Sequence, residues 1–204
     1  MYKRYFKRWM DIACSLTFMI AFSWLYIIIA ALVWMMMGGP VFFTQERPGL
    51  NGKIFKVYKF RTMTNAKDSN GKFLPDEQRQ TRFGNLLRST SLDELPQVFN
   101  IFKGDMSLIG PRPMMQMYLD GCTAEELKRQ TVRPGLSGLA QVQGRNNLPY
   151  NERFAYDLEY INNITFWGDI KLIFRTIGKV LKREGVVGEE LPQLEEEQRE
   201  KVTR

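Results

Sequence analysis

Histidine is absent from this sequence of 204 residues, and cysteine occurs only as Cys14 and Cys122. Without histidine, Ser-His-Asp and Cys-His catalysis, imidazole acid–base chemistry and His-ligated zinc are all excluded. The two cysteines lie far apart and form no C-x-x-C pair, so the sequence favours neither a disulfide framework nor a thiolate metal site. Chemistry must therefore come from carboxylates, lysine, arginine, hydroxyls, backbone N–H groups or a hard metal ion.

Acidic residues are fewer than basic ones. Lysine and arginine number 29 and the acidic residues 22, which gives a formal net charge of +7. A basic balance attracts an anionic partner, which includes nucleic acid, anionic lipid headgroups and phosphorylated substrates. The charge alone does not choose among these partners. The length indicates one folded domain with additional segments.

Charged residues are also missing from one long stretch, residues 12–37. As a helix it would be about 39 Å long, more than the roughly 30 Å hydrocarbon core of a bilayer requires. It is longer than the apolar region of a signal peptide, about 7–15 residues. Basic residues flank it on both sides, whereas spanning segments usually carry them on the cytoplasmic side only. A spanning segment and a re-entrant one that bends near Ser23 both remain open. In a bend, the Ser23 hydroxyl could satisfy a freed backbone carbonyl.

The remainder predicts an α+β fold that is mainly helical. Residues 40–63, "PVFFTQERPGLNGKIFKVYKFRTM", alternate around Pro-Gly and Asn-Gly turn signals and predict short strands or a hairpin. Residues 65–81 read as a polar loop, and residues 82–102 have helical spacing interrupted at Pro96. Residues 169–183 predict an amphipathic helix that either rests in the lipid headgroup layer or packs on the core.

Two adjacent carboxylates, Asp93 and Glu94, lie in the stretch "STSLDELPQ". Ser91 and Glu94 match a capping box, although that places Pro96 where its ring and missing N–H are costly. Asp93 as the N-cap residue is the less awkward structural alternative. Taken alone, this stretch favours a structural role over a catalytic one.

Two glycine-bearing segments downstream change this interpretation. They are "NIFKGDMSLIGPRP" and "VRPGLSGLAQVQGR", which combine backbone N–H groups with Arg112, Arg133 and Arg145. Guanidinium forks and backbone donors suit the oxygens of a diphosphate. Neither segment is a G-x-G-x-x-G or Walker loop, so kinase and dinucleotide-binding functions are not supported. In this setting we predict that the Asp-Glu pair is a reacting centre.

Four motifs resemble those of the bacterial sugar transferases, the monotopic polyprenyl-phosphate phosphoglycosyl transferases. They are "KFRTM" (59–63), "SLDELPQVFNIFKGDMSLIGPRP" (91–113), "RPGLSGLAQVQGR" (133–145) and "YDLEYINNITFWGDI" (156–170). The resemblance covers roughly residues 1–185 and is to the small class of the family, which is little more than a catalytic domain.

The resemblance implies transfer of a sugar 1-phosphate from a UDP-sugar to undecaprenyl phosphate, with release of UMP. It implies two steps with Mg²⁺, in which Asp93 is the nucleophile and Glu94 a metal ligand or electrostatic partner; both are metal-ligand candidates. The donor expected from it is UDP-N,N′-diacetylbacillosamine, and UDP-glucose, UDP-galactose and UDP-N-acetylhexosamines are the alternatives. The expected location is the cytoplasmic face of a bacterial inner membrane, with the bilayer and not nucleic acid as a partner.

The resemblance also implies a domain layout. Residues 1–38 would be a re-entrant anchor, residues 39–188 the catalytic domain with interfacial helices, and residues 189–204 a charged, flexible tail. Related proteins usually bend the anchor at a Ser-Pro pair, whereas this chain has Ser23-Trp24. Tryptophan neither removes an N–H group nor forces a kink. The re-entrant topology is therefore less well supported than the catalysis.

Several side chains are candidate substrate contacts, and each arginine among them has a surface salt bridge, worth about 0–1 kcal/mol, as its structural alternative. Asp157 either caps a helix or contacts the nucleotide, and Asp169 is expected to be structural. The rival function is a non-enzymatic, membrane-anchored module that binds anionic lipid or RNA. The candidates are Lys59, Arg61, Arg88, Pro111, Arg112, Arg133, Gln141, Arg145 and Asp157.

Overall fold

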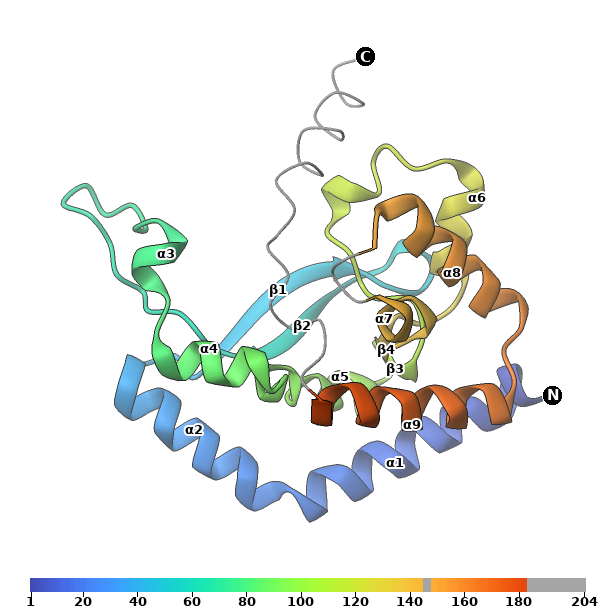
Figure 1. Cartoon of the computed structure of the whole chain (residues 1–204), viewed down its shortest axis with the longest axis horizontal. Coiled ribbons are helices and arrows are strands. Elements are labelled where there is room, and N and C mark those ends of the chain that lie inside the picture. Colours follow the sequence, from blue (N-terminus) through green and yellow to red (C-terminus); the bar gives the residue numbers. More distant parts are fainter. Residues whose placement is uncertain (145–147, 183–204) are drawn as a thin grey trace.

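The computed structural model describes residues 1–144 and 148–182, and it mixes helices with two small sheets (Figure 1). The predicted mixture of helices with a small hairpin is confirmed. The predicted tail lies outside the described residues. The helices are α1 (Lys7–Ala21), α2 (Ser23–Met37), α3 (Asp76–Arg79), α4 (Arg82–Ser89), α5 (Gln97–Lys103), α6 (Ala124–Leu127), α7 (Leu139–Gln143), α8 (Tyr150–Asn162) and α9 (Phe166–Lys182); the strands are β1 (Phe42–Pro48), β2 (Ile54–Phe60), β3 (Ser107–Ile109) and β4 (Gly135–Ser137).

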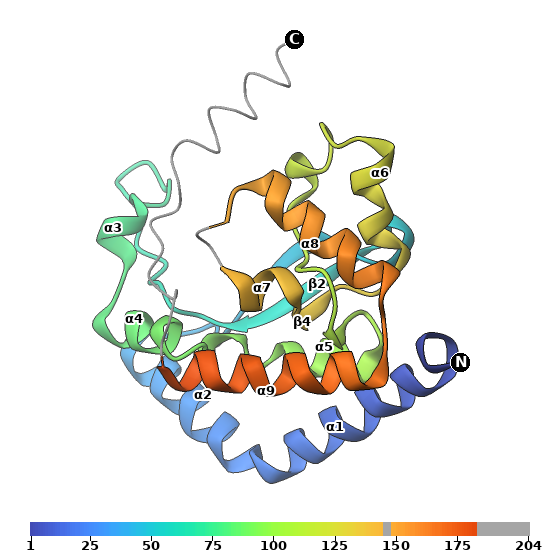
Figure 2. The same cartoon turned by 45° about the vertical axis from the view of Figure 1, so that its right-hand side comes forward.

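The N-terminal helices α1 and α2 form a V, and α4, α5 and α9 lie across its open side (Figures 1 and 2). The two axes differ by 64°. Among the described residues, no single helix is long and apolar enough to cross a membrane, although α1 and α2 together are by length and composition. The V places the ends of this apolar segment beside the same folded body.

Two side chains bond the carbonyls at the break in the V. Ser23 Oγ donates to the Ile20 carbonyl at 3.1 Å, as predicted for a bend at this serine. Trp24, which occupies the position of the expected proline, donates its indole N–H to the Ala21 carbonyl at 3.1 Å. The bend thus forms without proline because side chains replace backbone donors.

The predicted hairpin is confirmed. Strands β1 and β2 pair antiparallel, from Phe42 opposite Phe60 to Pro48 opposite Ile54. The connecting turn places Asn51 at φ 53° and Gly52 at φ 75°. These are two residue types that tolerate the left-handed region, so the Asn-Gly signal has a direct structural cause.

The two glycine-bearing segments form the parallel pair β3–β4. The Gly110 N–H donates to the Ser137 carbonyl at 2.8 Å, and the Gly135 N–H donates to the Pro111 carbonyl at 2.9 Å. A Cβ on Gly135 would overlap the Gly110 backbone. These two N–H groups pair the segments with each other, and the glycines permit the close approach, so the predicted contact with a diphosphate stays a prediction for the segments' other donors.

Three apolar clusters join the elements. One packs Ile109 under α8 and α9, one joins the hairpin to α5, and one joins α2 to β2 and α4. In the third cluster, Ile29 and Val33 of α2 are buried with Phe60 and Leu87. Helix α2 is therefore part of the folded core on one face, while its other face is exposed.

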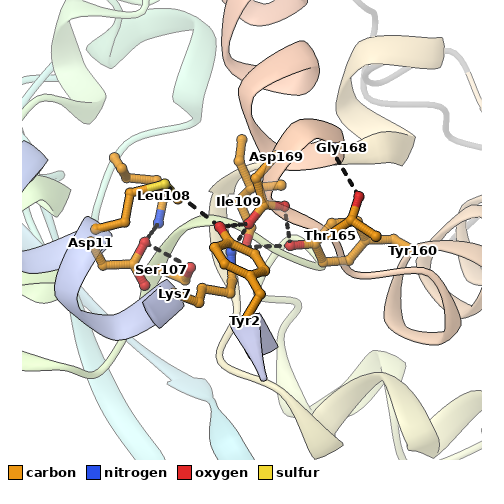
Figure 3. Close-up of polar contacts among 11 residues, drawn as sticks. Tyr2, Lys7, Asp11, Ser107, Leu108, Ile109, Tyr160, Thr165, Gly168 and Asp169 are labelled. Carbon is orange, nitrogen blue, oxygen red and sulfur yellow. Dashed lines mark hydrogen bonds and ion pairs between the residues drawn. The ribbon is translucent and has the colours of Figure 1, made fainter. Parts of the chain in front are cut away.

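A buried polar network attaches α1 and the chain before it to the folded body (Figure 3). Asp169 of α9 is fully buried. It accepts hydrogen bonds from Tyr2 Oη at 2.7 Å, Lys7 Nζ at 2.6 Å and Tyr160 Oη at 2.8 Å. Asp11 accepts from Ser107 Oγ at 3.0 Å. The prediction that Asp169 is structural is confirmed.

Exposed apolar side chains concentrate on the V and on α9. Helix α9 buries Leu172 but exposes large apolar side chains along its other face, so the predicted amphipathic helix is present. Helix α9 follows α8 closely along the chain, since α8 ends at Asn162 and α9 begins at Phe166. The exposed large apolar residues of α1, α2 and α9 include Trp9, Ile20, Trp24, Ile27, Trp34, Met35, Phe166, Trp167, Phe174, Ile177 and Leu181.

Candidate active site

Asp93 and Glu94 lie in a 3₁₀ turn, Leu92–Glu94, between α4 and α5. Ser91 precedes the turn in the left-handed region, at φ 57° and ψ 17°, and makes no capping hydrogen bond. Pro96 is the N-cap residue of α5, where its missing N–H costs no helical bond. Both capping predictions are therefore wrong. A non-glycine residue in this region costs about 1–3 kcal/mol, and such strain is concentrated at functional sites.

Two cations meet the carboxylates at this turn. Lys59 Nζ lies 2.8 Å from Glu94 Oε1 and 3.9 Å from Asp93 Oδ2. Arg112 Nη2 lies 2.8 Å from the same Glu94 oxygen. The structure thus brings two of the predicted substrate contacts, from β2 and from the segment after β3, to the dyad.

A third predicted cation, Arg88, lies close enough to act on the dyad electrostatically. Its Nε donates to Thr62 Oγ1 at 3.0 Å, which anchors the side chain from α4 to the chain after β2. Its positive charge lowers the pKa of Asp93, in the same sense as the charges of Lys59 and Arg112. The dyad therefore faces positive charge from three separate segments of the chain.

Asn100 positions α5 against the strand that carries Lys59, and the sequence analysis missed it. The side chain is fully buried. Its Nδ2 donates to the Lys56 carbonyl at 2.7 Å and its Oδ1 accepts from the Tyr58 N–H at 3.1 Å. The amide thus mimics a neighbouring strand. The signal was an asparagine inside an otherwise apolar helical stretch.

The two carboxylates have opposite electrostatic environments. Burial, and then the charge of Glu94, raises the pKa of Asp93 to about 6. Burial alone would raise the pKa of Glu94 as well, but Arg112 and Lys59 hold it well below its usual value. Glu94 is therefore committed to its ion pairs. Asp93 has no hydrogen bond to its carboxylate from any described residue, and it is largely ionised at neutral pH.

Two other predicted contacts, Arg61 and Arg133, have structural partners instead. The buried Arg61 donates to the carbonyls of Met37, Gly38 and Gly39 at the end of α2. Arg133 Nε donates to the Gly104 carbonyl at 2.8 Å, at the end of α5. In this conformation neither guanidinium is part of the dyad cluster, because each caps a helix end.

Asp157 forms a buried ion pair with Arg129, whose Nη2 lies 2.6 Å from Asp157 Oδ2. The carboxyl residue is only 2% exposed. A direct contact with the nucleotide, which the resemblance predicted, would require this pair to open. Helix capping is also not its role, since it lies within α8.

The last three candidate contacts are Pro111, Gln141 and Arg145, and their surroundings differ. Pro111 is buried and accepts the Gly135 N–H, so its contact is with the backbone. Gln141 has a buried amide whose nitrogen and oxygen find no partner among residues 1–144 and 148–182. Arg145 lies outside the described residues. Gln141 therefore offers hydrogen-bonding groups that no described residue uses.

Asp93 and Glu94 can hold a hard cation only if substrate oxygens or waters complete its coordination. Within the described part of the chain, no group of three or more His, Cys, Asp or Glu residues could hold a metal ion. Mg²⁺ is usually bound through one or two carboxylates, waters and substrate phosphates. Asp93 and Glu94 fit that arrangement, with phosphate oxygens and waters as the remaining ligands.

Comparisons with known proteins agree on one family. The model of the bacterial sugar transferase family matches residues 2–183. An uncharacterized sugar transferase EpsL of Bacillus subtilis is 44% identical over 88% of this chain and 89% of its own length. The undecaprenyl-phosphate galactose phosphotransferase of Salmonella typhimurium is 38% identical over 89% of this chain and 42% of its own length.

A further relative has a different sugar in its name. The UDP-N-acetylgalactosamine-undecaprenyl-phosphate N-acetylgalactosaminephosphotransferase of Aeromonas hydrophila is 38% identical over 87% of this chain. The match covers 44% of that protein. The chain therefore spans less than half the length of the Salmonella and Aeromonas relatives, and most of the length of the one from Bacillus.

Proposed function

The chain belongs to the bacterial sugar transferase family, and from this premise we propose that it transfers a sugar 1-phosphate from a UDP-sugar to undecaprenyl phosphate. UMP is the second product. The observation that carries the proposal is the dyad itself. Glu94 is ion-paired with Lys59 and Arg112, while the carboxylate of the ionised Asp93 accepts no hydrogen bond from residues 1–144 and 148–182.

In the proposed first step, a carboxylate oxygen of Asp93 attacks the phosphorus that carries the sugar. A new oxygen–phosphorus bond forms, and the bond to the bridging oxygen breaks as UMP leaves with the electron pair. In the second step, a phosphate oxygen of the lipid acceptor attacks the same phosphorus and expels Asp93. The acceptor oxygen is already anionic, so neither step needs histidine.

The surrounding cations prepare the site for two anions that would otherwise repel each other. Lys59 and Arg112 neutralise Glu94, and the more remote charge of Arg88 favours the ionised form of Asp93. We propose that Asp93 and Glu94 hold Mg²⁺ together with oxygens of the diphosphate, where the ion would neutralise charge on the phosphoryl group.

We propose that the V of α1 and α2 enters a bacterial inner membrane and returns on the cytoplasmic face. Support comes from the two ends of the V, which bind the same folded body: Lys7 pairs with Asp169, and Arg61 binds the carbonyls after α2. Helix α9 lies beside the open side of the V (Figure 2), and the headgroup layer would cover the large apolar side chains that it exposes.

Labelling tests the topology. We expect a label at Asn51 and one at the N-terminus to react only from the cytoplasmic side. An N-terminus that reacts only from the opposite side would mean that the segment spans the membrane.

The donor sugar is the finer part of the proposal. UDP-N,N′-diacetylbacillosamine is the donor expected from the sequence motifs, while the names of relatives favour UDP-galactose and UDP-N-acetylgalactosamine as candidates. A panel of UDP-sugars, tested with undecaprenyl phosphate and Mg²⁺, would identify the donor by release of UMP. If no donor gives UMP, the rival function as a membrane-anchored binding module gains support.

A trapping experiment tests the covalent step. The purified protein is incubated with its donor and Mg²⁺ but without the lipid acceptor. We expect mass spectrometry to find a sugar phosphate on Asp93, and none on the Asp93→Asn variant. Attachment to another residue, or lipid product formed without any adduct, would overturn the two-step route.

A further inference from the structure

Three aromatic rings form a row that ends at the half-exposed side chain of Tyr118. The row starts at Phe154 of α8, whose ring centroid lies 6.2 Å from that of Tyr150. Tyr150 in turn lies 5.3 Å from Tyr118, with 32° between the planes. Tyr118 belongs to a 3₁₀ turn, Gln116–Tyr118, and has no other ring contact within the described residues. One end of the row is therefore open.

Arginines line this row and connect it to the dyad. The Arg129 guanidinium lies 5.3 Å from the Phe154 ring, and that of Arg153 lies 5.2 Å from the Tyr150 ring. Arg129 Nη2 also donates to the Arg112 carbonyl at 2.7 Å. Because the Arg112 side chain binds Glu94, the row and the dyad share one residue as a link.

Arg47 of β1 adds a positive charge without a carboxylate partner. Its Nη2 donates to Gln45 Oε1 at 2.6 Å, and Gln45 contacts Met115 Sδ at 3.5 Å, just before the turn that carries Tyr118. No ion pair of Arg47 occurs within residues 1–144 and 148–182. Burial, and then the positive charge of Arg112, lower the pKa of Arg47.

We propose that Arg47 and Tyr118 form the nucleotide end of the donor site, an inference that rests on the proposed function. Arg47 would share the diphosphate with Arg112, and the pyrimidine would stack on the open face of Tyr118. Guanidinium groups bind phosphate oxygens through two parallel hydrogen bonds, and bases stack on aromatic side chains irrespective of sequence. The sugar phosphate would then lie toward Asp93.

A purely structural row is the simpler explanation, and two features argue against it. A packing row would bury its last ring, whereas Tyr118 remains half-exposed on a short turn. A half-buried arginine near another arginine is also costly unless an anion compensates it. A nucleoside diphosphate accounts for both features with one ligand, because its phosphates supply the anion for Arg47 and its base supplies a planar ring for Tyr118.

Calorimetry on the full chain in nanodiscs, with Mg²⁺, separates the base from the diphosphate. The probes are UDP and inorganic diphosphate. For Tyr118→Leu we expect UDP to bind about 10-fold more weakly, with inorganic diphosphate unchanged, because only stacking is lost. For Arg47→Gln we expect both probes to bind about 10-fold more weakly, because a charged contact is lost.

Matched variants control for changes elsewhere. Tyr118→Phe keeps the ring and should retain the UDP affinity of the wild type, which distinguishes stacking from damage to the fold. Tyr156→Leu on the same helix as Tyr150, and Arg82→Gln at the exposed start of α4, should change neither affinity.

The outcomes separate this inference from the proposed function. If the wild type binds UDP and the Tyr118→Leu and Arg47→Gln variants bind it equally well, the nucleotide end lies elsewhere and the transferase proposal stands. If Tyr118→Leu weakens both probes alike, Tyr118 does not recognise the base. If the wild type binds neither probe, the proposed function itself fails.

Discussion

Two buried aspartates in this molecule, Asp93 and Asp169, each lie near a lysine and differ in how completely their carboxylates are paired. Asp169 accepts from one lysine and two tyrosines, and its lysine partner lies at 2.6 Å. Asp93 lies 3.9 Å from Lys59, which is closer to Glu94. Both aspartates are at least nine-tenths buried. Burial and a nearby lysine therefore do not distinguish the structural aspartate, Asp169, from the proposed nucleophile, Asp93.

The difference lies in the second carboxylate. Glu94 takes the nearest contacts of both Lys59 and Arg112, so Asp93 is left with a raised pKa and an available oxygen. Asp169 has no acidic neighbour in the sequence, and both of its carboxylate oxygens accept hydrogen bonds (Figure 3). A pair of like charges with unequal pairing is what prepares one of them for reaction. Each variant below tests one side of this comparison.

Asp93→Asn should have the largest effect. The amide cannot form the covalent intermediate, so we expect turnover to fall by at least about 10³-fold. The fold should remain because Glu94 keeps its ion pairs, and most of the affinity for UDP should remain because Glu94 still offers a ligand to the proposed Mg²⁺. The rate of UMP release and calorimetry with UDP measure the two quantities. Turnover within about 10-fold of the wild type would remove the nucleophile from the proposed mechanism.

Asp169→Asn should have the next largest effect, and on stability instead of chemistry. Removing one partner of a buried ion pair costs about 3–5 kcal/mol, because Lys7 is left buried and unpaired. Thermal unfolding in nanodiscs measures the loss. Asp120→Asn, at an exposed aspartate bonded to Gln116, is the matched control and should change little.

A double variant sharpens this test. Lys7→Met combined with Asp169→Leu removes both charges, so we expect it to be more stable than Asp169→Asn alone. If Asp169→Asn is as stable as the wild type, the network in Figure 3 does not attach α1 to the folded body.

The pH dependence of stability should distinguish the two aspartates in metal-free buffer. The pKa of Asp93 in the folded protein, about 6, is above its usual value of 3.8, so folding favours the protonated form. Its contribution is therefore present below about pH 4 and is lost as the pH rises through 6. Asp93→Asn should gain up to about 3 kcal/mol over the wild type at pH 7.

The control for this prediction is the same comparison at pH 4, where the difference between the variant and the wild type should vanish. A constant difference across the range would mean that Asp93 titrates normally. The expected sign is opposite to that of Asp169→Asn, whose loss of stability should be present at neutral pH.

Local features of the fold were predictable, and long-range contacts were not. The hairpin followed from Asn51-Gly52, whose residue types suit the turn they form. The dyad followed from its motif, since an Asp-Glu pair is adjacent in the chain as well as in space. Which cations meet it was only half predictable. Lys59 and Arg112 reach Glu94, whereas Arg61 caps α2.

The differences between prediction and structure have one physical origin. Arginine, aspartate and glycine suit both ligand binding and close packing, and the sequence alone does not say which of the two they do. In the structure, Gly110 and Gly135 hydrogen-bond each other's segments, and Asp157 forms an ion pair with Arg129. Asn100 was missed for the converse reason, because a buried amide bonded to a strand edge requires a fold already in place.

Tyr26→Phe should have the smallest effect, and it tests whether α2 supports the dyad as Asp169 supports α1. Tyr26 Oη donates to the Leu95 carbonyl at 2.6 Å, one residue after Glu94. Leu92 and Leu95, on either side of the dyad, pack against the same cluster as α2. Loss of the hydroxyl removes about 1 kcal/mol of hydrogen bonding and loosens the turn. We expect kcat to fall about 5-fold with KM for the donor unchanged.

Tyr156→Phe is the matched control, since Tyr156 belongs to α8 and not to the cluster that packs α2 against this turn. A structural role alone would lower the stability of Tyr26→Phe and leave kcat per folded molecule at the wild-type value. A fall in kcat without a change in KM indicates that the hydroxyl positions the reacting carboxylate. The position of Asp93 would then depend on α2 as well as on the nearby cations, whereas the position of Asp169 depends on its own hydrogen-bond donors.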